Sequence, residues 1–104
     1  MRYHPEEFQI KVITSIQEVK DEGFMSLIGQ RITVFGAIYI YTGDLVGVND
    51  TCIKLENPAI VYETGAFTDK KWKDAQNLPN TIYIQTGMIE SFGIVKWPYR
   101  RKLK

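Results

Sequence analysis

The sequence has little of what enzymes and secreted proteins usually depend on. Its 104 residues include one histidine, His4, and one cysteine, Cys52. A lone cysteine excludes an intrachain disulfide and suits a reducing, cytoplasmic setting. No run of 18 apolar residues occurs, and the N-terminus lacks the apolar segment of a signal peptide. We therefore expect a soluble protein with no membrane partner.

Catalytic and metal-binding patterns are also missing. His4 lies close to the chain end, so it is a poor base for a serine or cysteine nucleophile. Cys52 alternates with its neighbours as a buried strand residue does. There is no cluster with zinc or calcium spacing, and no glycine-rich loop that opens a helix. The sequence predicts a protein that is not an enzyme and has no metal and no cofactor.

Charge is nearly balanced, with 13 basic and 12 acidic residues, which excludes a polycation. The last nine residues nevertheless hold five basic residues and no acid: Lys96, Arg100, Arg101, Lys102 and Lys104. Trp97 among these cations is typical of single-strand binders, but a solvated end whose Trp97 closes the last strand is the simpler alternative. Trp72 with Lys70, Lys71 and Lys73 forms a second such cluster. Trp72 is expected to pack inward there, and a rim contact to a nucleic acid or a partner stays open.

Hydrophobic periodicity predicts a single domain with a helical lead followed by about five short strands. Ser15 to Glu18 matches a capping box and favours a helix over 15–22, although Phe8, Ile10 and Val12 also alternate like a strand. From residue 27 the period changes to two. The expected strands are 32–35, 38–48, 51–56, 81–86 and 92–97, with a short helix over 68–76. Asn57 and Pro58 interrupt the third strand, and its resumption over 59–62 stays open. Gly43 and Gly47 inside a strand indicate bulges that bend it.

Three segments carry a family resemblance: Leu27 to Phe35, Tyr41 to Asn49 and Cys52 to Asn57. Together they resemble the first Sm motif of Sm and LSm proteins, with matching positions at Gly29, Gly43, Leu45, Val48 and Leu55. The interval 43–57 is similar to the equivalent stretch of bacterial Hfq, and 82–96 is a weaker match to the second motif. Thr51 stands where Hfq has an aromatic residue, and Gln85 and Thr86 precede Gly87 where the family has a basic residue.

The resemblance implies a mainly β fold: an N-terminal helix and a strongly bent five-stranded antiparallel sheet, closed as a small SH3-like barrel. The single domain 1–104 then divides into a helical lead (1–26), a first motif (27–57), a long connection (58–80), a second motif (81–97) and a basic tail (98–104). Edge strands pair with those of neighbouring copies in such a fold, giving a homo-oligomeric ring of about five to seven subunits. The expected interface residues are Ile82, Tyr83, Ile84, Phe92 and Ile94.

The resemblance also implies binding of single-stranded, uridine- or adenine-rich RNA, in a role in RNA metabolism. The expected contacts are two turns and the tail: Asn49, Asp50, Thr51, Thr86, Gly87, Arg100, Arg101 and Lys102. The tail, or Lys70, Lys71 and Lys73, is expected to supply the salt-dependent electrostatic attraction. The alternative is a structural or protein-interaction ring module that binds no nucleic acid. The missing basic residue beside Gly87 favours that alternative.

Overall fold

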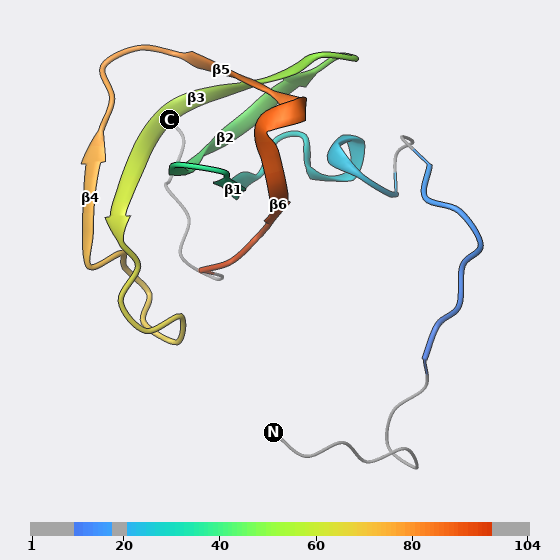
Figure 1. The fold of residues 1–104 in the computed structure, drawn as a ribbon, viewed down its shortest axis with the longest axis horizontal. Coiled ribbons are helices and arrows are strands. Elements are labelled where there is room, and N and C mark those ends of the chain that lie inside the picture. The colour runs from blue at the N-terminus through green and yellow to red at the C-terminus, as the bar shows by residue number, and fades with distance from the viewer. Residues whose placement is uncertain (1–9, 18–20, 97–104) are drawn as a thin grey trace.

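The fold of residues 10–17 and 21–96, the part of the chain that the structure describes, comes from a computed structural model (Figure 1). It consists of short strands and two single-turn 3-10 helices, with no α-helix in the described residues. In chain order these are η1 (Phe24–Leu27), β1 (Arg31–Gly36), β2 (Ile40–Val48), β3 (Cys52–Glu63), β4 (Asp74–Asn77), β5 (Ile82–Gln85), η2 (Thr86–Met88) and β6 (Ile89–Gly93).

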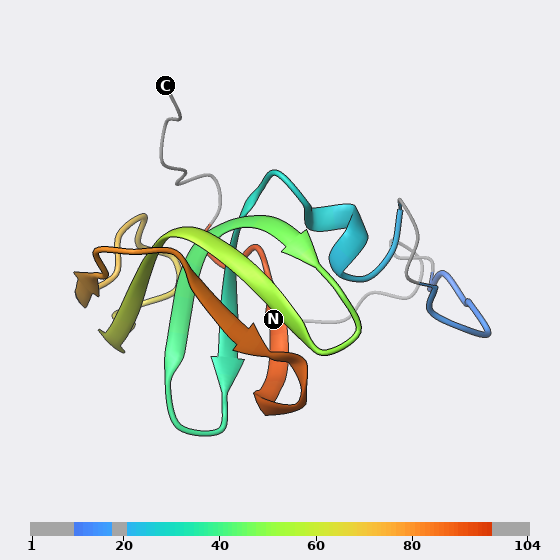
Figure 2. The ribbon, with the colours of Figure 1, turned by 90° about the horizontal axis from the view of Figure 1, so that it is seen from above.

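All six strands belong to one antiparallel sheet, which confirms the mainly β, antiparallel part of the prediction. The order is β4-β3-β2-β1-β6, and β5 pairs with the first half of β3 while β4 pairs with the second half. The sheet is strongly bent (Figure 2). No ladder joins β5 to β6 in the described residues, so the sheet is not closed into a barrel. The expected closure is not found.

Two bulges between β2 and β3 bend the sheet, at the places that the glycines indicate. Beside Gly43, β3 carries the two residues Asn57 and Pro58 against one residue of β2. Asn57 has a φ of 49°, and Pro58 is tolerated there because a bulge does not need its missing N–H. The second bulge places Val46 as an extra residue in β2 before Gly47. The strand expected to end at Glu56 therefore continues to Glu63.

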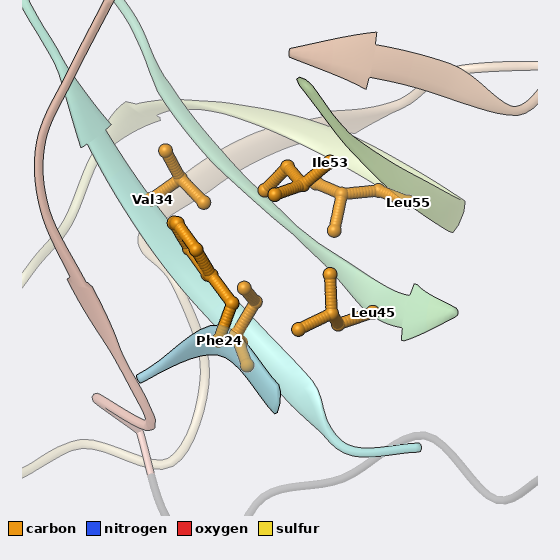
Figure 3. Packing of buried hydrophobic residues seen from close by; sticks show 6 residues of the cluster. Phe24, Val34, Leu45, Ile53 and Leu55 are labelled. Carbon is orange, nitrogen blue, oxygen red and sulfur yellow. The ribbon is translucent and has the colours of Figure 1, made fainter. Parts of the chain in front are cut away.

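The core lies inside the bend of the sheet, and η1 covers one end of it (Figure 3). The buried side chains in contact are Phe24, Ile32, Val34, Leu45, Ile53 and Leu55. A Cβ on Gly43 would come within 3.0 Å of the Leu55 Cβ, so glycine lets β2 and β3 approach closely at this point. The Phe24 ring stacks on Phe92 of β6, with 3.7 Å between the ring centroids.

The expected N-terminal helix over 15–22 is absent from its described part, residues 15–17 and 21–22; residues 18–20 lie outside the described residues. The segment 10–17 runs away from the sheet (Figure 1), and its side chains Ile10, Val12, Ile13 and Ile16 are exposed. An isolated helix this short is marginal in water without a packed face. The capping-box pattern alone does not form one.

The expected helix over 68–76 is also wrong. Residues 68–73 form turns and bends, and Asp74–Asn77 is the strand β4. The second half of β3 presents unpaired backbone groups, and β4 pairs with them despite its weak strand propensity. The last strand begins at Ile89, earlier than expected, and ends at Gly93. Residue 97 of the expected strand 92–97 lies outside the described residues.

Candidate functional site

Two turns that are distant in sequence meet at one end of β3. The backbone N–H of Thr86 donates a hydrogen bond to the carbonyl oxygen of Thr51 at 2.8 Å, and the Thr86 hydroxyl donates to the same oxygen at 3.3 Å. The ladder between β3 and β5 starts beside them, at Cys52 and Gln85. The structure thus brings together five of the predicted site residues, which we call the joined turns: Asn49, Asp50, Thr51, Thr86 and Gly87.

The Asn49 side chain shapes the first of these turns. Its Oδ1 accepts hydrogen bonds from the backbone N–H groups of Thr51, at 2.8 Å, and Cys52, at 2.9 Å. The Thr51 hydroxyl donates to the same oxygen at 3.3 Å. Such a side chain replaces a backbone acceptor in a tight turn. The Asn49 Oδ1 is therefore already used as the acceptor of hydrogen bonds within its own turn.

We predict that Asn49→Ala lowers the free energy of unfolding by about 1 kcal/mol, because two backbone donors lose their acceptor at an exposed turn. Urea unfolding measures the change. Asn49→Asp keeps an acceptor oxygen at this position and is expected to retain most of the stability. Equal stability of Asn49→Ala and the unmodified protein would contradict this role of the side chain.

Two open grooves flank the joined turns. One, of about 360 Å³, is lined by Phe24, Met25, Val48, Asn49, Asp50 and Thr86. The other, of about 560 Å³, is lined by Asp50, Thr51, Cys52, Tyr83, Gln85, Thr86 and Gly87. Among the described residues, Asp50 is the one charged residue in either lining. The surface at the joined turns therefore offers hydrogen-bonding groups and apolar walls, with no lysine or arginine in the two linings.

The predicted cations that the structure describes do not lie at the joined turns. Lys70, Lys71 and Lys73 are exposed in the segment between β3 and β4, at the opposite end of β3 (Figure 1). Arg100, Arg101, Lys102 and Lys104 lie outside the described residues. The joined turns and the described basic cluster of Lys70, Lys71 and Lys73 therefore lie at opposite ends of the 12-residue strand β3.

Lys96 has a position that the sequence did not reveal. It is 5% exposed, and its Nζ donates to the carbonyl oxygens of Ala66, at 2.7 Å, and Lys71, at 3.1 Å. The same Nζ lies 4.9 Å from the ring centroid of Trp72 and 5.7 Å from that of Phe67. This cation therefore fastens the segment 64–73 to the chain that follows β6. In the sequence, Phe67 and Trp72 were the available signal of such a contact. Their partner Lys96 could not be identified because it follows them by 24 or more positions.

We predict that Lys96→Met lowers the free energy of unfolding by about 1–3 kcal/mol, because two charge-assisted hydrogen bonds and the cation–π contacts are lost. Urea unfolding measures the loss. Hydrogen exchange should show faster exchange of the Asp69 and Lys73 amides, which bond to carbonyls of their own segment. Lys70→Met removes the same charge from an exposed position and should leave both measurements unchanged. Unchanged exchange in Lys96→Met would contradict the fastening role.

A buried ion pair crosses the first two strands. The Arg31 Nη1 lies 3.1 Å from the Asp44 Oδ1, with the two side chains 11% and 6% exposed. The Asn57 Nδ2 donates to the other Asp44 oxygen at 2.9 Å. The arrangement connects β1, β2 and the bulge of β3. Sequence reasoning missed it, because Arg31 and Asp44 give no local signal of their pairing.

The edges of the sheet carry the predicted assembly residues. The outer edges of β5 and β6 have no strand partner within the described residues. Tyr83 is 64% exposed, and Phe92 and Ile94 are also exposed. Ile82 and Ile84 instead pack against the core of their own chain. The side chains available for an edge contact are therefore those of Tyr83, Phe92 and Ile94, and Phe92 is partly covered by Phe24.

Other chemistry has little support in the described residues. Within residues 10–17 and 21–96, no three histidine, cysteine, aspartate or glutamate side chains are grouped to hold a metal ion. The Cys52 thiol is free and half-buried in β3. The same residues contain no helix with the length and apolarity to cross a membrane. No protein-family model matches the chain, and no curated protein matches it.

Proposed function

We propose that the chain is a subunit of an Sm-like homo-oligomeric ring that binds single-stranded, uridine- or adenine-rich RNA at the joined turns. The observation that carries the proposal is the pair of hydrogen bonds from Thr86 to the Thr51 carbonyl. Because of these bonds, residues from two separate motifs form one continuous polar surface with a groove on each side.

The joined turns suit contacts to bases better than contacts to phosphates. The Asn49 amide N–H groups and the Thr51 hydroxyl are exposed hydrogen-bonding groups that can meet the edges of unpaired bases. Asp50 repels a phosphate backbone. Neutralisation of phosphates is therefore assigned to the basic tail, Arg100, Arg101 and Lys102, and binding should weaken as salt is raised.

Ring assembly is proposed to use two of the unpaired edges, β5 of one copy against β6 of the next. An unpaired strand edge exposes backbone N–H and C=O groups that can pair with another chain. Contact between two different edges is a head-to-tail contact, and repeating it closes a ring when the rotation from one subunit to the next allows it. The exposed Tyr83 and Ile94 lie at or beside these edges. Burial of such apolar surface would add stability to a chain with a small core.

Charge reversal at the first turn tests the RNA site. We expect Asp50→Lys to tighten binding of a labelled oligouridylate or oligoadenylate by threefold or more at low salt, because it replaces a repelling charge with an attracting one. Glu56→Lys makes the same charge change at an exposed residue of β3 that lines none of the grooves, and it is expected to have a smaller effect. Fluorescence anisotropy measures both affinities. Equal effects of the two variants would mean that RNA does not contact the joined turns.

A second candidate function is an assembly module that binds no nucleic acid. The specific observation in its favour is that no lysine or arginine of residues 10–17 and 21–96 lines either groove at the joined turns. An oligomer of several subunits that binds neither oligonucleotide at low salt would select this function over the first.

A further inference from the structure

A third groove lies near the opposite end of β3 from the joined turns, and it differs from the first two in charge. Its volume is about 310 Å³, and its lining is Arg31, Thr42, Ala59, Lys71, Trp72, Lys73, Asp74, Ala75 and Asn77. Three of these residues are cations and one is an acid. The groove is formed by β1, β2, β3, β4 and the segment before β4, which are distant in sequence.

The cations of this groove are fixed to the fold through their surroundings. The Arg31 guanidinium is oriented by the Asp44 carboxylate at 3.1 Å, which leaves its remaining N–H groups for other acceptors. The Lys71 carbonyl accepts from Lys96, and the Lys73 N–H donates to the Thr64 carbonyl at 3.4 Å. The backbone that carries both lysines is therefore held in place, while their ammonium groups stay exposed.

Trp72 adds an aromatic surface to the same groove. Its ring also lines a small crevice on the side of Lys96, whose Nζ is 4.9 Å from the ring centroid. The indole is thus held by a cation within its own chain. Asn77, which lines the same groove, provides an exposed amide. The groove therefore combines three kinds of group: cations that can contact a phosphate, an aromatic ring on which a base can stack, and an amide that can hydrogen-bond to the edge of a base.

We infer that this groove binds a nucleoside phosphate, either as a free nucleotide or as one nucleotide of a single strand. The volume is at the lower end of small-ligand sites, about 300–1,000 Å³, and suits a ligand of this size. The inference does not rest on the proposed function, because it concerns other residues at the other end of β3.

Calorimetric titration with uridine 5′-monophosphate, and separately with a hexauridylate, tests the inference at low salt. The double variant Lys71→Glu/Lys73→Glu should weaken binding by tenfold or more, since two charge-assisted contacts are reversed. The matched control is Lys70→Glu with Lys11→Glu, which changes charge equally at positions that do not line the groove. Its expected effect is less than threefold.

Each outcome of these titrations is informative. Binding of the mononucleotide assigns the groove to free nucleotides, and binding of the hexauridylate alone assigns it to a strand. Equal weakening by the lining and control pairs would overturn the inference, because general charge would then explain the binding. If neither the mononucleotide nor the hexauridylate binds, the inference is also overturned. Asp50→Lys should leave mononucleotide binding unchanged, so failure here is distinguishable from failure of the site at the joined turns.

Discussion

Asp44→Ala is expected to lower the free energy of unfolding by about 3–5 kcal/mol, the usual cost of leaving one member of a buried ion pair without its partner. Arg31 is then left with an uncompensated charge in a side chain that is 11% exposed. The Asn57 amide also loses its acceptor, at a residue already held at a φ of 49°. Chemical denaturation monitored by circular dichroism measures the loss.

A second variant makes this prediction specific to the ion pair. Arg31→Met combined with Asp44→Ala removes both charges, so the double variant should be more stable than Asp44→Ala alone. Asp44→Asn keeps a hydrogen-bond acceptor for Asn57 and is expected to cost less than Asp44→Ala. If the double variant is less stable than the unmodified protein by the sum of the losses measured for Arg31→Met and Asp44→Ala alone, the two side chains do not interact.

Tyr83→Asp is expected to dissociate the proposed ring into monomers. Tyr83 is 64% exposed on β5, whose outer edge has no partner in the described part of the chain. A carboxylate buried at a subunit contact would be strongly unfavourable without a cation. Within the monomer the change is tolerable, since the side chain at position 83 is largely exposed to water. Light scattering measures the mass.

Tyr62→Asp is the matched control for this change. Tyr62 is an exposed tyrosine near the other end of β3, where its hydroxyl hydrogen bonds with the Gln76 amide oxygen. Its replacement should leave the mass of the assembly unchanged. If Tyr83→Asp retains the mass of the unmodified protein, β5 does not form the subunit contact. If both variants dissociate, the effect is not specific to that edge.

Local sequence features predicted the centre of the sheet well. Glycine at 43 and 47 indicated bulges because a residue without a Cβ permits bends and close approach, and both bulges occur there. The family resemblance named the turns at Asn49 and Thr86 as candidate contacts, and the structure places them side by side. These features depend on the steric needs of single residues and on the order of neighbouring strands.

Features that depend on distant partners were not predicted. β4 has the sequence Asp-Ala-Gln-Asn, which favours turns, and it becomes a strand because β3 offers an unpaired edge. The helix expected from Ser15 lacks a surface to pack on. Lys96 was grouped with the basic tail, but its ammonium group lies among carbonyls and aromatic rings of residues 24 to 30 positions earlier. Closure of the sheet also depends on long-range pairing, which the periodicity of single strands does not specify.

The most direct test of the proposed function is the solution mass of the unmodified protein by light scattering, with and without a short uridine- or adenine-rich RNA. The account predicts a mass of several 12.0 kDa subunits, with RNA bound at low salt and released as salt is raised. A monomer at every protein concentration, with no RNA bound at low salt, would contradict it.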